Sequence, residues 1–308
     1  AGKIGYPVMV RPSYVLGGRG MEVVYDDVAM ADYMKAAVGV TPDRPILIDR
    51  FLNHALECES DAICDGTNAF VPAVMEHIEL AGVHSGDSAC VIPSVHISRE
   101  NVETIKEYTR KIAEEMHVQG LMNMQYAIEN GKVFVLEANP RASRTVPLVS
   151  KVMVPIATEI ITRELTGKES PVPALEEKVI PYYGVKEAAF PFNMFPEVDP
   201  LLGPEMRSTG EVLGLSESYG EAFYKAQEAV QSKLPLSGTV LISVNRKDKA
   251  EVVEVAKLFH ENNFRIIATE GTCQLINEAG IPAEKVKKLC EGRPNVLDEI
   301  TNGKVDII

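Results

Sequence analysis

The chain has 308 residues, a length that predicts about two domains. Its 45% hydrophobic and 24% charged residues are typical of globular proteins and exclude the collagen-like, disordered and disulfide-scaffold classes. The formal net charge of −13 repels phosphate groups over the surface as a whole, which argues against general binding to nucleic acid or to anionic membranes. Any anionic ligand therefore needs a local cluster of positive groups.

The sequence contains no apolar run long enough to span a bilayer and opens without a signal peptide, so we expect a cytoplasmic protein. The five cysteines are odd in number and include no Cys-x-x-Cys pair. This pattern argues against a disulfide framework or a zinc site, and we expect reduced, mostly buried thiols.

Strand-like runs alternate with helical stretches along most of the chain, which is typical of a mixed α/β protein. The strand-like runs cover residues 6–11, 21–25, 46–49, 69–75, 121–128 and 133–138. The clearest helix begins at Ser98, a good N-cap residue, and carries an apolar stripe from Val102 to Met116. Residues 167–204 are rich in Pro and Gly, which predicts irregular structure with at most short strands.

The pattern of predicted elements changes beyond Pro235. Residues 239–244 form a buried-strand run, a helix capped by Asp248 follows, and residues 264–269 form a second strand. A β-α-β unit of this length predicts a parallel sheet in a separate C-terminal domain. Because β-rich runs lie almost at both ends of the chain, we expect an excised fragment.

The strongest chemical signal is a predicted hairpin of residues 121–128 and 133–138, joined through Asn130-Gly131. A two-residue loop sets Gln125 opposite Leu136, whereas a three-residue loop sets Gln125 opposite Glu137 and on the same face. In the second register Asn139 follows on that face, and three oxygen donors suited to Mg²⁺ or Mn²⁺ come together.

Two arginines follow the second strand of this hairpin, in a Glu-x-Asn-x-Arg-x-x-Arg spacing that begins at Glu137. Arg141 and Arg144 can match the spread negative charge of a transferring phosphoryl group beside a metal ion. A surface hairpin with a solvated polar face explains neither the spacing nor the clustered charge.

Three weaker signals accompany the hairpin. A glycine-rich bend between Arg11 and Met21 lets backbone N–H groups approach phosphates, although such a bend is more often a bare turn, and no P-loop motif is present. His84 lies in a polar loop with two glycines, which leaves it room to contact a ligand. Glu57 lies on a predicted strand in the string Ala55-Leu56-Glu57-Cys58-Glu59. Taken alone, a glutamate on such a strand is more often a solvated residue than one that binds a ligand.

Four strings in this sequence together resemble the large subunit of carbamoyl-phosphate synthase. They are Val10-Arg11-Pro12-Ser13-Tyr14, Gly-Val-His-Ser-Gly-Asp-Ser-Ala at 82–89, Glu-Ala-Asn-Pro-Arg-Ala-Ser-Arg-Thr-Val-Pro at 137–147, and Asp-Pro-Leu-Leu-Gly-Pro-Glu-Met-Arg-Ser-Thr-Gly-Glu-Val at 199–212. The last string, followed by a β-α-β domain, resembles the second synthetase half of that subunit. The resemblance implies an ATP-grasp fold of mostly antiparallel sheets with helices in residues 1–235, which lacks its N-terminal portion. It also implies part of a methylglyoxal-synthase-like allosteric domain in residues 236–308, truncated at its C-terminus.

The resemblance also assigns roles to residues. It makes Gln125, Glu137 and Asn139 the ligands of Mg²⁺ or Mn²⁺, with K⁺ as a further candidate cation. Arg141 and Arg144 would hold the phosphate that is transferred from ATP to carbamate. The ATP site would be lined by Arg11, Asp49, Leu52, Glu57, Gly82, Val83, His84, Ser85, Gln125 and Glu137. In the C-terminal domain, Lys249, Thr269, Thr272 and Lys288 would bind the phosphate of a nucleotide effector, although a plain strand-to-helix turn is an equal reading of residues 269–272.

The implied function is the ATP-dependent phosphorylation of carbamate to carbamoyl phosphate, within a glutamine-dependent synthase that feeds pyrimidine and arginine biosynthesis. The implied partners are a glutaminase small subunit and the remainder of the large subunit, and we expect the isolated fragment to be inactive. Two alternatives stay open. One is another ATP-grasp carboxylate ligase, and the other is a non-catalytic nucleotide-binding regulatory module.

Overall fold

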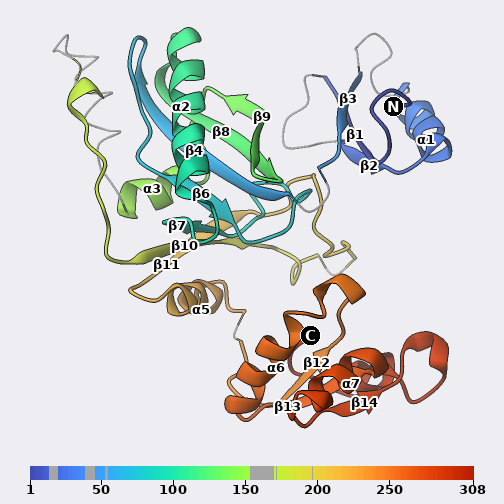
Figure 1. Ribbon diagram of the computed structural model, residues 1–308. Coiled ribbons are helices and arrows are strands. Elements are labelled where there is room, and N and C mark those ends of the chain that lie inside the picture. Colours follow the sequence, from blue (N-terminus) through green and yellow to red (C-terminus); the bar gives the residue numbers. More distant parts are fainter. Residues whose placement is uncertain are drawn as a thin grey trace. The chain divides into compact units, whose positions relative to one another are not determined.

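The computed structural model describes residues 1–13, 20–38, 46–52, 55–152, 170, 172–195, 197–232 and 234–308 (Figure 1). The chain divides into two compact units, Ala1–Ser232 and Lys233–Ile308. Most of the glycine-rich bend predicted after Arg11, including Arg19, lies outside the described residues.

The larger unit begins with a small antiparallel sheet. Strand β1 (Val8–Pro12) lies between β2 (Glu22–Val24) and β3 (Ile46–Arg50), and α1 (Asp27–Val38) follows β2. Val8, Val10 and Val24 are fully buried together with Tyr33 of α1. Alternate apolar residues of short strands therefore form a core of their own, as the period of a half-buried strand requires.

An eight-stranded antiparallel sheet forms the rest of this unit, in the order β11-β10-β7-β6-β4-β8-β9, with β5 paired to β4 (Figure 1). Its strands are β4 (Leu56–Asp65), β5 (Ala69–Phe70), β6 (Val74–His77), β7 (Cys90–Ile92), β8 (Gln119–Glu129), β9 (Lys132–Asn139), β10 (Tyr183–Ala189) and β11 (Gly210–Ser216). Among its described residues, the helices are α2 (Arg99–Glu115), α3 (Val146–Val152) and α5 (Tyr219–Ala229), with a 3₁₀ turn at Val172–Ala174.

One face of the central strands packs against α2. Cys58 and Ala62 of β4 and Met124 and Tyr126 of β8 are fully buried in the same cluster as Ile105 of α2. Because successive side chains of a strand alternate between faces, the odd-numbered residues of β4 and of this part of β8 face the opposite side. That opposite face carries the polar residues described below.

The helix predicted from Ser98 is confirmed. Ser98 is the N-cap of α2, and its side chain accepts a hydrogen bond of 3.2 Å from the backbone N–H of Asn101. Inside the packed face, the hydroxyl of Thr109 lies 2.7 Å from both the Ser60 hydroxyl and the Tyr126 hydroxyl. This chain of three hydroxyls satisfies polar groups that the apolar cluster encloses.

Two predictions for the strands of this sheet were wrong. Residues 167–204 contain β10, a strand of seven residues that pairs with both β7 and β11. The local sequence did not indicate β10, because its flanks are rich in Pro. Pairing with strands far along the chain stabilises β10 more than its local sequence does. The single strand predicted at 69–75 is instead β5 and β6, separated by Val71, Pro72 and Ala73.

Helix α5 packs closely on β10 and β11. Ala222 and Ala226 of α5 are fully buried against Val185 of β10. A Cβ atom on Gly214 of β11 would overlap the carbonyl oxygen of Ala222. The small residues on both elements therefore permit the close approach of this helix to the sheet.

The smaller unit contains a parallel sheet in the order β12-β13-β14, which confirms the predicted β-α-β unit. Its strands are β12 (Thr239–Ile242), β13 (Arg265–Thr269) and β14 (Glu284–Val286), and its helices are α6 (Val252–Glu261), α7 (Glu270–Glu278) and α8 (Val296–Thr301). The cap predicted at Asp248 was wrong, because Asp248 ends a 3₁₀ turn (Arg246–Asp248) and Glu251 is the N-cap residue of α6.

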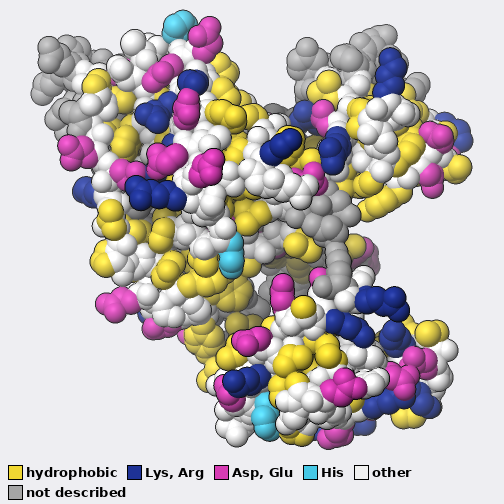
Figure 2. Space-filling view, viewed as in Figure 1, with side chains coloured by type: hydrophobic (Ala, Val, Ile, Leu, Met, Phe, Trp, Pro, Cys, Tyr) yellow, Lys and Arg dark blue, Asp and Glu magenta, His cyan; other side chains and the backbone are white. Residues whose placement is uncertain are grey.

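Acidic and basic side chains are interspersed over the visible face of the molecule (Figure 2). The net negative charge therefore does not gather into one large acidic patch on this face. In the described parts of the chain, no helix is both long enough and apolar enough to cross a bilayer. Four cysteines are buried and Cys290 is exposed, and all five are free thiols, as predicted.

Glu187 of β10 offers a test of this packing. Its side chain is buried and accepts a hydrogen bond of 2.5 Å from Gln227 of α5. Burial, together with the negative charge of Glu79, raises the pKa of Glu187 to about 7. The folded state therefore binds a proton that the unfolded state releases above about pH 4.5, and the free energy of unfolding falls as pH rises from about 4.5 to 7.

We expect Glu187→Gln to remove this pH dependence. The free energy of unfolding of the variant, measured relative to that of the original chain, should be higher at pH 8 than at pH 5. The increase should be up to about 3 kcal/mol, because one pKa unit corresponds to about 1.4 kcal/mol. Urea unfolding followed by circular dichroism at both pH values measures the difference. The matched control is exposed Glu217→Gln, and an equal effect of the two variants would contradict the prediction.

Candidate active site

The hairpin of β8 and β9 places Gln125 opposite Glu137, as the metal-site prediction requires. The three-residue loop that was expected to produce this pairing is wrong. The loop contains only Asn130 and Gly131, and Glu129 pairs with Lys132. Both loop residues have positive φ values, 51° and 74°, as a tight type I′ turn demands. A β-bulge at Leu136 then shifts the register, so that Gln125 and Glu137 share a face after all.

Two rows of polar residues cross β4, β8 and β9 on this face. The register sets Glu59 opposite Gln125, which is opposite Glu137. The next row contains Asp61, Asn123 and Asn139 in the same order. Six carboxylate and amide groups from three strands thus meet on one small area, since paired residues of neighbouring strands share a face.

Asn123 joins the two buried carboxylates of these rows. Its side-chain amide donates to Glu59 Oε2 at 2.9 Å and to Asp61 Oδ1 at 3.0 Å. Burial raises the pKa of Asp61 to about 6, and the negative charge of Glu59 adds to this effect. Burial alone would raise the pKa of Glu59 too, but His77, Lys186 and Asn123 outweigh it and lower that pKa.

The loop of residues 82–89, which contains the predicted ATP-site residues Gly82, Val83, His84 and Ser85, contacts the hairpin directly. Gln125 Nε2 donates to Ser85 Oγ at 2.7 Å, and none of the described residues donates a hydrogen bond to Gln125 Oε1, which can therefore face a cation. The backbone N–H of Gly82 donates to Glu57 Oε1 at 3.1 Å. Loop and sheet are therefore joined at two points.

His84 is held within the same loop. Its Nδ1 accepts a hydrogen bond of 3.0 Å from Gly86 N, and its own backbone N–H donates to Gly203 O at 2.8 Å. Burial lowers the pKa of His84, so the ring is neutral near pH 7. Nε2 of this ring is then the N–H that can donate to a ligand, because Nδ1 acts as an acceptor.

A buried cluster of titratable groups extends the first row towards β7 and β10. His77 Nε2 lies 3.3 Å from Glu59 Oε1, and Cys90 Sγ lies 3.5 Å from the same oxygen. Lys186, 1% exposed, donates to the backbone oxygen of Ser85 at 3.3 Å. Burial opposes a charge on either cation, but the neighbouring thiol and carboxylates raise the pKa values of both His77 and Lys186.

The two predicted phosphate-binding arginines lie in different settings. Arg144 donates from Nη1 to Ser208 Oγ at 2.7 Å and from Nη2 to Ser208 O at 3.1 Å. The exposed Arg141 donates to the backbone oxygen of its neighbour Ala142 at 3.1 Å. Arg144 is therefore fixed to another segment, whereas Arg141 has only a local contact among the described residues.

The predicted ATP-site residues of the N-terminal sheet form a separate group. Arg11 Nε lies 2.8 Å from Asp49 Oδ2 across β1 and β3. Leu52 follows Phe51, whose ring lies against Gly82 of the 82–89 loop. The backbone N–H of Gly20 also donates to Glu205 Oε1 at 2.9 Å. The small sheet thus contacts segments that border the polar face.

The donor set fits a hard divalent cation. Glu137 is exposed, and no described residue donates a hydrogen bond to its carboxylate. Asn139 has a buried Nδ2 for which the described part of the chain supplies no acceptor, and a phosphate oxygen beside the cation would satisfy it. Oxygen atoms of Gln125, Glu137 and Asn139 are the ligand types that Mg²⁺ binds together with nucleotide phosphates.

The four residues predicted to bind an effector phosphate lie in the smaller unit, around the start of α7. Lys249 Nζ donates to Gly271 O at 3.0 Å, and Thr269 Oγ1 lies 3.0 Å from Ser243 Oγ. Thr269 and Thr272 are buried. Lys288 precedes a 3₁₀ turn (Leu289–Glu291), and no hydrogen bond among the described residues joins it to the other three.

Several residues of this face were not predicted from the sequence as site residues. Glu59 and Asp61 had a visible signal, because acidic residues at 57, 59 and 61 fall on one face of any strand. Asn123 similarly precedes Gln125 by two residues. His77, Cys90 and Lys186 had none, because their meeting depends on the pairing of β6, β7 and β10.

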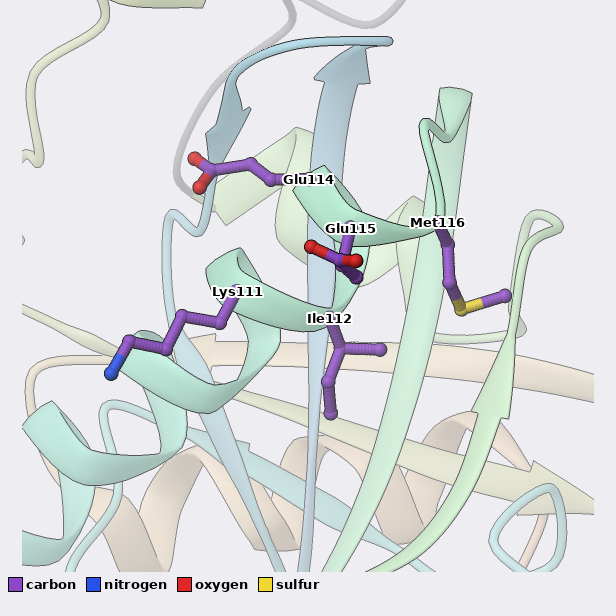
Figure 3. A pocket seen from close by; sticks show the side chains of 5 residues that line it. All are labelled: Lys111, Ile112, Glu114, Glu115 and Met116. Carbon is purple, nitrogen blue, oxygen red and sulfur yellow. The ribbon is translucent and has the colours of Figure 1, made fainter.

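A surface depression on the end of α2 is lined by Lys111, Ile112, Glu114, Glu115 and Met116 (Figure 3). Its lining side chains come from one end of the helix (Figure 3). None of them belongs to the polar face described above.

We expect Glu59→Gln to lower the pKa of His77, because the variant removes a buried carboxylate that stabilises the imidazolium. An NMR titration of the His77 ring measures this pKa. The matched control is Glu76→Gln, since Glu76 is equally buried but contacts His96 and the backbone of residues 95–97. An unchanged His77 titration in the Glu59 variant would contradict the assigned contact.

Comparisons with known proteins identify the family and the fold of this chain. The family model for the carbamoyl-phosphate synthase L chain, ATP binding domain, matches residues 1–162, and the model for the MGS-like domain matches residues 251–308. The chain is similar in structure to the biotin carboxylase domain of Hydrogenobacter thermophilus 2-oxoglutarate carboxylase, whose crystal contains MgADP and bicarbonate, with a TM-score of 0.54 and 16% identity. That likeness covers 76% of this chain and 57% of the other, and confirms the predicted ATP-grasp fold class.

The curated relatives are much closer in sequence. The carbamoyl phosphate synthase large chain of Archaeoglobus fulgidus is 54% identical over 100% of this chain. The C-terminal section of the large chain of Methanocaldococcus jannaschii is 49% identical, also over 100% of this chain. This chain spans 29% and 52% of the lengths of those two relatives. With matches of this extent, the chain belongs to the carbamoyl-phosphate synthase large chain family.

Proposed function

We propose that the larger unit is part of a synthetase centre that transfers the γ-phosphoryl group of ATP to carbamate, which yields carbamoyl phosphate and ADP. The observation that carries this proposal is the shared face of Gln125, Glu137 and Asn139, created by the bulge at Leu136. The membership of the large chain family supports the choice of carbamate as the acceptor.

The protein takes little part in the covalent chemistry of this reaction. A carbamate oxygen forms a bond to the γ-phosphorus while the bond from that phosphorus to the bridging oxygen of ADP breaks, and no protein nucleophile is needed. A cation held by Gln125, Glu137 and Asn139, Mg²⁺ or Mn²⁺, would neutralise negative charge on the nucleotide phosphates. Arg144 and Arg141 would stabilise the charge on the transferring group, because planar guanidinium groups match phosphoryl oxygens.

The remaining predicted residues bind and orient ATP. Ser85 holds the Gln125 amide, and Glu57 holds the backbone of Gly82, so the 82–89 loop has a set position over the sheet. Neutral His84 can donate a hydrogen bond from Nε2 to the nucleotide. Arg11 and Asp49, with Leu52, form the side of the site contributed by the small sheet, and K⁺ is a further candidate cation for the acidic face.

This chain works as part of a larger protein. We expect its partners to be the remainder of the large chain and a glutaminase small subunit, in a synthase that feeds pyrimidine and arginine biosynthesis. The smaller unit would bind a nucleotide effector through Lys249, Thr269, Thr272 and Lys288. The match to an MGS-like domain supports that regulatory role.

A non-catalytic nucleotide-binding module is the second candidate, because the same face could bind MgATP without transferring phosphate. Glu137→Gln separates the two candidates in the complete protein. We expect a loss on the order of 10²-fold in carbamate-dependent ADP formation, since the variant removes the exposed carboxylate expected to hold the cation. Glu129→Gln, on the same hairpin but paired with Arg50, is the control. An unchanged rate in the Glu137 variant would favour the binding module.

We also expect this chain alone to release no ADP above background when carbamate and MgATP are supplied. The physical reason is that it spans only 29% of the Archaeoglobus relative, so other parts of that length would have to complete the site. A coupled ADP assay measures the outcome, with the complete protein as the positive control. Full turnover by this chain would contradict the prediction.

A further inference from the structure

Arg144 lies between two residues whose hydroxyl groups bind the same buried carboxylate. Ser143 Oγ donates to Asp61 Oδ1 at 2.8 Å, and Thr145 Oγ1 donates to Asp61 Oδ2 at 2.7 Å. Ser143 Oγ also accepts hydrogen bonds from the backbone N–H groups of Thr145 and Val146, at the start of α3. Asp61 therefore fixes the backbone on both sides of Arg144.

A second buried carboxylate fixes the group that receives the Arg144 side chain. Asp87, which is fully buried, accepts from Arg207 N at 2.8 Å and from Ser208 N at 2.9 Å. Ser208 Oγ also donates to Gly86 O at 3.1 Å. The serine that holds the guanidinium is thus itself attached to the 82–89 loop.

These contacts explain why two charged groups are buried at this point. Asp61 is 4% exposed, and a buried carboxylate is tolerated only where hydrogen-bond donors surround it. Its donors come from Asn123, Ser143 and Thr145, which are side chains of two other segments. Both aspartates therefore act on Arg144 indirectly. Asp61 holds its chain neighbours Ser143 and Thr145, and Asp87 holds Ser208, which binds the guanidinium.

We infer that Asp61 and Asp87 are positioning residues for Arg144. They hold its guanidinium at the place where the transferring phosphoryl group passes, and this inference rests on the proposed function. Ser208 uses only two of the N–H groups of Arg144, and the guanidinium has five, so donors remain for phosphoryl oxygens. Small displacements of such a group slow phosphoryl transfer strongly, because catalysis there depends mainly on position and charge.

The test uses the complete synthase and measures kcat and the KM for ATP. The variants are Asp61→Asn, Asp87→Asn, Arg144→Gln and the double variant of Asp61 and Arg144. Thr145→Val removes a single hydroxyl contact with Asp61 and supplies a milder change in case the aspartate variants fold poorly. The control is Asp65→Asn, because Asp65 lies on the same strand and holds the backbone of Thr67 and Asn68, and no hydrogen bond between described residues joins it to residues 143–145.

We expect Asp61→Asn and Asp87→Asn to lower kcat about 10- to 100-fold, the range typical of residues that orient a functional group, and to change the KM for ATP less than about threefold. Thr145→Val should lower kcat by a smaller factor. The double variant should be about as slow as Arg144→Gln alone, because residues that act through one group are not additive. Asp65→Asn should keep the original kcat.

Two outcomes would overturn the inference. One is an unchanged kcat in the Asp61 variant, or in Thr145→Val where the former does not fold, while Arg144→Gln is slow. The other is a double variant whose loss is the full product of the two single losses, which would indicate a general structural effect. If Arg144→Gln and Glu137→Gln both keep the original rate, the proposed function itself fails instead.

Discussion

Three carboxylates on one face of β4 constrain the rest of the larger unit. Glu57, Glu59 and Asp61 follow one another at every second position, and the last two are almost fully buried. A carboxylate in such a place requires donors, and the donors come from distant parts of the chain. Gly82 binds the first, His77 and Asn123 bind the second, and the segment around Arg144 binds the third. The loops of the site are thus ordered around β4.

The sequence was most informative where a local rule decides the structure. Asn130-Gly131 predicts the hairpin, and the expected face of Gln125 and Glu137 is correct. The turn is nonetheless the two-residue form, and the shared face depends on a bulge five residues beyond it. No local rule places a bulge at Leu136, whose side chain is exposed on the edge strand β9. A correct prediction of the site therefore rested on a wrong loop length.

The parts that could not be predicted depend on pairing between distant strands. Lys186 reaches the polar face only because β10 pairs with β7, about ninety residues earlier in the chain, and β10 lies within a segment that reads as irregular. Asp61 had a signal in the alternating acidic residues of β4, but its partners Ser143 and Thr145 had none. The contacts of Asp87 with residues 207 and 208 likewise join segments more than a hundred residues apart.

The distribution of hydrogen bonds over this face separates two kinds of acidic group. Glu59 and Asp61 are buried, and donors from the protein already surround their oxygens, so a cation would have to displace those donors. Glu137 differs because it is exposed and receives no hydrogen bond from the described residues. Within the described part of this face, an incoming cation therefore displaces fewer protein donors at Glu137 than at Glu59 or Asp61. The bulge thus does more than align two side chains, since it also places an exposed carboxylate on the same face as two buried carboxylates that already accept hydrogen bonds.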